Sequence, residues 1–217
     1  MTRTHGAAIA AVVLALLFAG AATVASAGDG ERSGPATPVS GSADAGFARD
    51  MSIHHQQAVE MSFIVRDRTD DEDVRRLAYD IANTQANQRG MMLGWLDLWG
   101  LPKVAPDAEP MAWMADGEGG HGGHSMAKAE EGSLMPGMAT DEQLARLGKL
   151  SGKKAEIEYL QLMIVHHNGG VDMAEGCVRL CAVGAERTLA QGMVDAQRSE
   201  VELMVDLLRE RGAQVRT

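Results

Sequence analysis

The feature of this chain that most constrains its fold is an internal duplication. The stretch FARDMSIHHQQAVEM at residues 47–61 recurs as YLQLMIVHHNGGVDM at residues 159–173, a shift of 112 positions (47 to 159). Without any gap, the same shift superposes Leu77 on Leu189, Gln85 on Gln197, Met92 on Met204 and Gly100 on Gly212. A register kept from residue 47 to residue 100 indicates that one structural unit occurs twice.

The repeated stretch has the periodicity of an amphipathic helix, at about 100° per residue. Its apolar face carries imidazoles and thioethers where a helix normally places leucine. These residues are Met51, His54, His55 and Met61 in the first copy, and Met163, His166, His167 and Met173 in the second. The second copy continues the same face with Cys177 and Cys181.

The N-terminus has the pattern of an export signal. A basic start (MTRTHG) precedes an apolar run and then Ala25-Ser26-Ala27, which predicts a secretory signal peptide over residues 1–27. The alternative is an uncleaved N-terminal membrane anchor, because the run approaches the ~20 residues that span a bilayer. Residues 28–43 are rich in Gly, Ser and Pro and predict a flexible leader. We therefore expect a secreted or periplasmic protein.

The net charge of the chain argues against two classes of binding partner. A net charge of −10 argues against binding to nucleic acid or to anionic membrane surfaces. No later stretch resembles a transmembrane span, so we expect no membrane association after signal cleavage. The rest of the chain is long enough for one domain with a hydrophobic core.

Helix signals divide the remaining chain into two hairpins. Hairpin one (44–100) is expected to hold helices at about 45–68 and 71–99, with Asp44 and Asp71 as N-caps. Hairpin two (140–212) is expected to hold a short helix at 140–150 and long helices at 153–182 and 185–211. Two hairpins that bury their apolar faces against each other predict an all-α, four-helix bundle over residues 44–212, with a long crossover at 101–139.

The second helix of each hairpin is expected to face the interior along one stripe. In hairpin one the stripe is Leu77, Ile81, Thr84, Gln88, Met91, Met92, Trp95 and Trp99. In hairpin two it is Leu189, Met193, Ala196, Glu200, Leu203 or Met204, and Leu207. Glu200 thus points inward as a metal ligand, as an acceptor that orients a histidine, or as the partner of an Arg or a protonated His. Its counterpart in hairpin one is Gln88.

Metal binding explains the repeated face best. Neutral imidazole is a common metal ligand, and the soft thioether selects Cu(I). Methionine also fills ordinary cores, and a single inward histidine is often just hydrogen-bonded. Two adjacent histidines on the core face of both halves, however, are costly to bury without a purpose. The predicted ligands are Met51, His54, His55, Met61, Met163, His166, His167, Met173 and Glu200.

Two further regions supply weaker candidates. The Gly-rich crossover carries Met111, Met114, His121, His124, Met126, Met135 and Met138, which fits a flexible arm that captures soft ions or, alternatively, a disordered linker. His121 and His124 also suit Zn²⁺ or Cu(II). Cys177 and Cys181 stand four residues apart in a predicted helix, where free buried thiols, a local disulfide and soft metal ligands are all open, and free thiols are favoured.

The sequence offers no machinery for nucleophilic catalysis. It lacks a Gly-rich phosphate loop, a G-x-S-x-G elbow and HExxH, and both His-His helices lack the ExxH pattern of di-iron bundles. A non-enzymatic protein is therefore expected.

The two copies of M-x-x-H-H-x5-M, each followed by Q-x-x-[EQ]-x-x-x-M (Gln85 to Met92 and Gln197 to Met204), resemble the exported bacterial proteins known as domain of unknown function 305. The resemblance covers about residues 44–212. It implies a ferritin-like fold and an exported copper-binding protein with copper at the repeated His and Met residues. Gln88 departs from the more usual Glu of that family.

These patterns lead to one hypothesis: an exported copper-binding protein that sequesters or transfers Cu(I) or Cu(II). Zinc and iron are alternative metals. A copper-handling protein and a second copy of the chain are candidate partners besides the metal ion. The rival hypotheses are a metal-dependent redox enzyme in a ferritin-like bundle and an interaction module that binds no metal.

Overall fold

The computed structural model describes residues 37–115 and 129–216, and every element within these ranges is helical. The helices are α2 (Ala43–Arg66), α3 (Glu72–Leu98), α4 (Ala112–Ala115), α5 (Asp141–Lys149), α6 (Gly152–Leu180) and α7 (Gly184–Glu210). The all-α prediction is confirmed. The predicted signal peptide and the first part of the predicted leader lie outside the described residues.

Side-chain caps fix the starts of α3 and α5 where the sequence predicted them. Asp71 caps α3 by accepting from the backbone N–H of Val74 at 3.0 Å. Thr140 and Gln143 form a capping box at the start of α5. The N-cap of α2 differs from the prediction: Ser42, not Asp44, accepts from a backbone N–H of the first turn, so the helix begins two residues early. Asp44 instead lies in that first turn.

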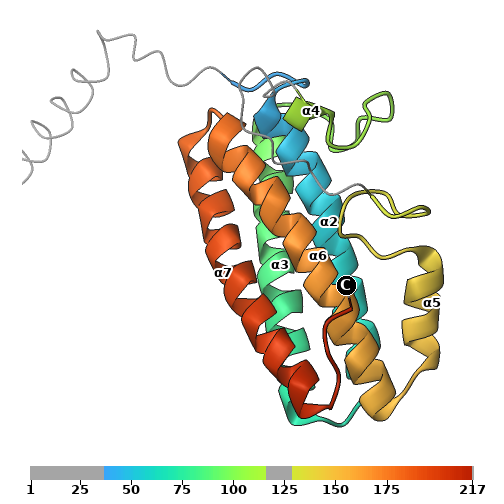
Figure 1. Ribbon diagram of the computed structural model, residues 1–217. Helices are drawn as coiled ribbons and strands as arrows, with labels where there is room; N and C mark the ends of the chain where they lie inside the picture. The colour runs from blue at the N-terminus through green and yellow to red at the C-terminus, as the bar shows by residue number, and fades with distance from the viewer. Residues whose placement is uncertain (1–36, 116–128, 217) are drawn as a thin grey trace, which may run out of the picture. The chain divides into compact units, whose positions relative to one another are not determined.

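The four long helices form the predicted bundle (Figure 1). α2 packs along α3, and α6 packs along α7, so each half of the duplication is a helical hairpin. α2 and α6, the two helices with the His-His motif, pack against each other and join the hairpins. α5 lies against α2 and α6. The repeated faces of the duplicated unit therefore meet at the α2–α6 interface.

The core consists of two apolar clusters with the His-His motifs between them. Met51 and Met173 belong to one cluster, and Met61 and Met163 belong to the other. On α2 the histidines lie between Met51 and Met61, and on α6 they lie between Met163 and Met173. The four imidazoles therefore form a polar layer across the middle of an apolar core.

Much of the crossover is packed, which corrects the prediction of a flexible arm for its described parts. Met111, Met114, Met135 and Met138 are buried in the same cluster as Met51. The carboxylate of Asp50 accepts from the backbone N–H of Met111 at 2.8 Å and from the indole N–H of Trp113 at 2.9 Å.

The second half of the crossover lies against α6. The carbonyl oxygen of Pro136 would be 2.4 Å from a Cβ atom at Gly169, so only glycine permits this approach. Gly137 has a φ of 83° in this close contact, a backbone conformation that glycine adopts without strain.

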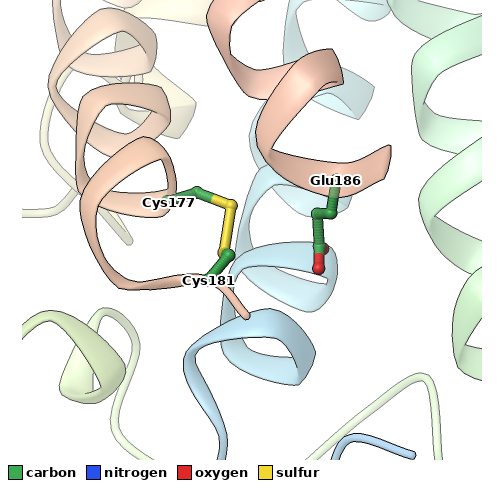
Figure 2. A group of neighbouring side chains, drawn as sticks. All are labelled: Cys177, Cys181 and Glu186. Atoms are coloured by element: carbon green, nitrogen blue, oxygen red, sulfur yellow. A yellow bond between two sulfur atoms is a disulfide. The ribbon is translucent and has the colours of Figure 1, made fainter. Parts of the chain in front are cut away.

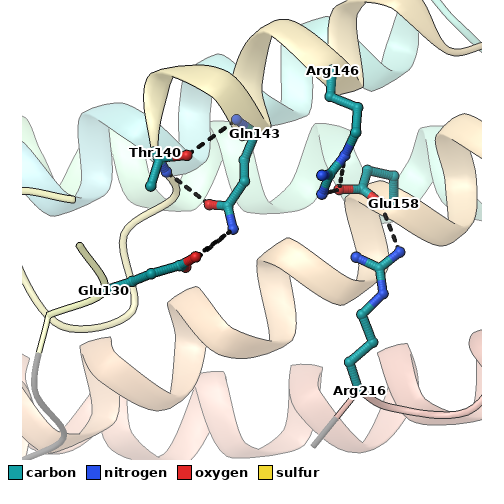
Figure 3. A network of polar contacts seen from close by, with 6 residues as sticks. All are labelled: Glu130, Thr140, Gln143, Arg146, Glu158 and Arg216. Atoms are coloured by element: carbon teal, nitrogen blue, oxygen red, sulfur yellow. Dashed lines mark hydrogen bonds and ion pairs between the residues drawn. The ribbon is translucent and has the colours of Figure 1, made fainter. Parts of the chain in front are cut away.

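Ion pairs fasten the remaining segments to α6 (Figure 3). The buried carboxylate of Glu158 binds Arg146 of α5 and, at 2.8 Å, Arg216 of the C-terminal segment. At the end of the bundle where α3 begins, the largely buried Arg211 binds Glu156 at 2.7 Å and Asp71 at 2.8 Å. These contacts hold α5 and the chain end in place around the core.

The inner stripes on α3 and α7 are partly shifted from the predicted ones. Thr84, Met91, Ala196 and Leu203 are exposed, whereas Gln85, Leu96 and Gln197 are buried. The buried face of each helix is rotated by about one residue from the predicted face. The packing of the neighbouring helix, rather than the average hydrophobicity of the sequence, determines which face is buried. Gln88 and Glu200 remain at the edge of this face.

Candidate metal centre

All four histidines of the repeated motif are completely buried. His54, His55, His166 and His167 have 0% exposed surface. His54 and His166, which occupy the same position in the two copies, stack with their ring centroids 3.8 Å apart. The prediction that these residues face the interior is confirmed.

The hydrogen bonds of three rings define their tautomers. Nε2 of His55 lies 2.8 Å from the Gln88 side-chain oxygen, and Nε2 of His166 lies 2.9 Å from the His54 carbonyl oxygen. Nε2 of His167 lies 2.7 Å from a carboxylate oxygen of Glu200. Because each partner is an acceptor, each Nε2 carries the proton, and each Nδ1 keeps a free lone pair.

These free nitrogens have no hydrogen-bond partner among the residues that the structure describes. Nδ1 of His55, His166 and His167 makes no hydrogen bond, and neither nitrogen of His54 reaches hydrogen-bond geometry, although the backbone of Pro136 lies near enough to that ring to raise its pKa against the effect of burial. Five buried ring nitrogens are thus unsatisfied. Buried polar atoms normally have a hydrogen-bond partner, so such a group calls for an explanation.

The two halves hold their second histidine in the same way. Gln88 follows His55 by 33 residues, and Glu200 follows His167 by the same 33 residues. One contact is to a neutral amide and the other to a carboxylate, so the site is not chemically symmetric. The expectation that Glu200 points inward and meets a histidine is confirmed, although its side chain is partly exposed.

Burial keeps the imidazoles of His54, His55 and His166 neutral. It lowers the pKa of His54 to about 3, and the charges of His55 and His167 act in the same direction. Burial likewise lowers the pKa of His55 to about 4, against the opposing hydrogen bond to Gln88. Burial also holds the pKa of His166 well below its usual value, with a further contribution from His54. Neutral imidazole is the form that ligates metals.

The four repeat methionines are all buried on either side of the histidine layer. Met51, Met61, Met163 and Met173 have 0% exposed surface. Their thioethers supply soft donors to the same interior, and methionine also suits the packing of an irregular core. Each apolar cluster receives one such methionine from α2 and one from α6.

The present ring positions limit the kind of site that is preformed. Among the described residues, the group of three His, Cys, Asp or Glu side chains whose ligand atoms lie within 4.8 Å of one another is Cys177, Cys181 and Glu186. No three of the four imidazoles come that close. The imidazoles as they stand therefore do not form a preassembled three-histidine site.

The weaker candidates have different outcomes. Met111 and Met114 are buried against the indole of Trp113 and the core, not displayed on an arm. His121, His124 and Met126 lie outside the described residues. Cys177 and Cys181 are buried but form a disulfide, so the preference for free thiols is wrong. Cys181 is the extended C-cap of α6, which lets its sulfur reach back to the last turn.

Three buried polar residues were missed as site residues in the sequence. Gln85 and Gln197 lie in the core, with both amide atoms of Gln85 and the amide oxygen of Gln197 unpartnered. A Cβ atom at Gly170 would lie 2.4 Å from that oxygen, so Gln197 lies directly over the helix of His166 and His167. The repeat register pairs the two glutamines and could have identified them. Glu186, at the start of α7, gave no comparable signal.

Fold and site define a duplicated helical hairpin with a buried layer of imidazoles flanked by thioethers. A family model described as Domain of unknown function (DUF305) matches residues 44–208, and the chain belongs to this family. No curated protein matches the chain. None of the helices in the described ranges has the length and hydropathy needed to cross a bilayer.

Solved structures share the fold. A DUF305 protein from Streptomyces coelicolor that is considered secreted is 62% identical, with a TM-score of 0.73 over 82% of this chain and 99% of that chain. A DUF305 fragment from Deinococcus radiodurans is 29% identical, with a TM-score of 0.63 over 82% and 99%. CopM in its Cu(I)-bound form is 19% identical, with a TM-score of 0.56 over 77% and 96%. CopM has also been solved with Cu(II) and with Ag.

Proposed function

We propose that this protein binds a soft metal cation, Cu(I) foremost, between α2 and α6 and sequesters or transfers it outside the cytoplasm. The ligands are drawn from His54, His55, His166 and His167 and from the four repeat methionines. The observation that carries the proposal is the set of unpartnered ring nitrogens at zero exposure.

The energetic argument favours a ligand over simple packing. Leaving one buried polar atom without a partner costs about 1–3 kcal/mol. Five such atoms in one layer lower the stability of the metal-free fold by several times that amount, whereas leucines would fill the same space at no such cost. A bound cation turns each unpartnered Nδ1 lone pair that it contacts into a stabilising interaction.

The donor set favours copper over zinc. Zinc prefers four ligands in a tetrahedron, and no three imidazoles lie close enough to begin one. Cu(I) accepts imidazole together with thioether, both of which this interior offers. The fold shared with CopM, which binds Cu(I), Cu(II) and Ag, supports the same choice.

Three observations support a location outside the cytoplasm. The first 27 residues have the pattern of a secretory signal. The related Streptomyces coelicolor protein is considered secreted. The disulfide between Cys177 and Cys181 suits an oxidising compartment.

Chelator competition for Cu(I) tests the proposal. The variant replaces His54 and His166 with Gln, and the control replaces His121 and His124, the weaker candidates of the crossover, so that the two regions are tested separately. The core variant is expected to lose tight, stoichiometric Cu(I) binding, and the control to retain it. Equal Cu(I) affinity in the core variant and the wild type would refute the proposal. Circular dichroism checks that both variants fold, and point variants are preferred to deletion of 101–139 because Met111, Met114, Met135 and Met138 of that segment pack into the core.

A further inference from the structure

A second cluster of potential ligands lies at the end of the bundle, apart from the histidine layer. It consists of Cys177 in the last turn of α6, Cys181 at the C-cap of that helix, and Glu186 in the first turn of α7 (Figure 2). One ligand atom from each of these residues lies within 4.8 Å of the other two. All three side chains are buried.

Glu186 is the unusual member of this cluster. It has 0% exposed surface, and among the described residues its carboxyl oxygens receive no N–H; the hydrogen bond open to it is with the neighbouring acid Asp44, when one of the two is protonated. The neighbouring acid, Asp44, is already bound to the backbone N–H of Val183 at 2.7 Å. A buried carboxyl whose polar neighbour is a second acid rather than a cation is costly, so this acid is poorly explained by the metal-free, disulfide-bonded state alone.

The disulfide itself adds little stability to account for the two cysteines. It closes a loop of four residues within one helix end, and the entropic gain from such a short loop is small. The small stabilisation by this disulfide therefore does not by itself account for the two cysteines, and the reactivity of their thiols is the other property to consider.

We propose that Cys177, Cys181 and Glu186 form a separate, redox-gated site for a thiophilic d10 cation. The disulfide is the closed state. A dithiol reductant opens it: the S–S bond takes up two electrons and two protons to give two thiols, while the reductant is oxidised to its own disulfide. The cation then replaces the two thiol protons, which pass to solvent, and is held by both thiolates with the carboxyl of Glu186 beside them.

Cu(I) is the cation that this donor set favours. Two thiolates satisfy Cu(I) at low coordination number, whereas Zn²⁺ needs a fourth ligand besides these three side chains. The surroundings are also soft and apolar: Cys177 and Cys181 share their cluster with Met111, Met114 and Met193. The site would therefore hold copper when the compartment is reducing and release it on oxidation.

Cu(I) stoichiometry in the two redox states tests this inference. The full-length protein is reduced with a phosphine, freed of reductant without air, and titrated with Cu(I) against a chelator, with Zn²⁺ in a parallel series. The reduced wild type is expected to bind one equivalent more Cu(I) than the oxidised wild type, with an ultraviolet thiolate-to-metal charge-transfer band. The Cys177→Ser/Cys181→Ser variant should lose that equivalent, and Glu186→Gln should weaken it at least tenfold.

Two further readouts keep the outcome decisive. If the double serine variant does not fold, alkylation of reduced wild type serves instead: bound Cu(I) should protect both cysteines from iodoacetamide, as read by mass spectrometry. The His54→Gln/His166→Gln variant should keep the reduction-dependent equivalent, which separates this site from the histidine layer. Equal stoichiometry in both redox states, or alkylation that Cu(I) does not slow, overturns the inference. Binding of Zn²⁺ but not Cu(I) would overturn the choice of copper.

Discussion

The stability of the metal-free protein should pass through a maximum between about pH 6.5 and pH 7, because its buried groups have pKa shifts with opposite effects. The perturbation is a change of pH from 8.5 to 5, with the disulfide intact. The groups concerned are the buried imidazoles of His54, His55 and His166, and the buried carboxyl of Glu186.

The histidines destabilise the fold as the pH falls. In the unfolded chain each imidazole takes up a proton below pH 6.5, whereas in the folded protein the pKa of His54 is about 3 and that of His55 about 4. The unfolded state therefore binds more protons, and stability falls with decreasing pH. By pH 5 each of these two histidines costs about 2 kcal/mol, since one proton is worth about 1.4 kcal/mol per pH unit. His166 acts in the same direction.

Glu186 acts in the opposite direction. Burial, followed by the charge of Asp44 and a hydrogen bond that forms when one of the two acids is protonated, raises the pKa of Glu186 to about 9. Its usual value is 4.5, so between these two pH values the folded state holds a proton that the unfolded state has lost. Stability is therefore lost as the pH rises, by about 2 kcal/mol between pH 6.5 and pH 8.

Stability is greatest at the pH where the folded and unfolded states bind equal numbers of protons. There the unfolded chain carries about one extra proton on these histidines, which offsets the extra proton that Glu186 holds in the folded state. For His54 and His55 this occurs at pH 6.5, where each is half protonated, and the contribution of His166 moves the point slightly higher. The carboxyls of the unfolded chain titrate at lower pH and do not contribute to the maximum.

Urea denaturation at half-unit steps of pH measures this curve. The Glu186→Gln variant should lose the alkaline decline, so that its stability rises from pH 5 and then stays level. Glu202→Gln, an exposed position on the same helix, should keep the maximum of the wild type. A wild-type curve that rises steadily to pH 8.5 would refute the reasoning on Glu186, and a flat curve from pH 6.5 to 5 would refute that on the histidines.

Three further predictions follow from the packing and the ion pairs. In urea denaturation Gly169→Ala should lower the free energy of unfolding by about 1–3 kcal/mol, because the new methyl group meets the backbone of the crossover. The control Gly90→Ala, in open space, should be neutral or raise the free energy of unfolding by up to ~1 kcal/mol. Equal effects of the two substitutions would contradict this prediction. Arg211→Ala should cost about 3–5 kcal/mol by leaving two carboxylates unpaired, against about 1 kcal/mol or less for the exposed Arg209→Ala; similar losses would argue against a buried ion pair. Glu200→Gln should weaken Cu(I) binding about tenfold or more in chelator competition, because a carboxylate partner raises the basicity of its imidazole; unchanged affinity would show that the carboxylate plays no part.

The duplication made the fold and the centre of the site predictable from the sequence. A helix has one apolar face, and two copies of one hairpin bury that face most simply against each other. The inward position of His54, His55, His166 and His167 followed directly from the periodicity, because a helix keeps its phase over these few turns. Caps with a clear chemical signature, such as Asp71 and Thr140, were also predictable.

The features that the sequence did not predict depend on contacts between distant segments. The Gly-rich composition of the crossover suggested an arm, yet Asp50 and the small residue Gly169 give it fixed places to bind. The disulfide depends on the extended backbone of Cys181, which hydrophobic periodicity does not report. The buried position of Gln197 depends on the space above Gly170 in the facing helix.

The difference between Gln88 and Glu200 makes the two halves of the duplicated fold chemically unequal. The duplication gives the second histidine of each half the same contact, because its Nε2 is bound to a side chain of the following long helix in both. A neutral amide acceptor adds little electron density to the imidazole of His55, whose pKa burial lowers to about 4, whereas a carboxylate raises the electron density on the free Nδ1 of His167. On the proposed function, the α6 half should therefore be the stronger donor, and the two halves should bind a soft cation unequally. Unequal donors allow one ligand to be released before the other, which suits a protein that transfers its metal better than one that only stores it.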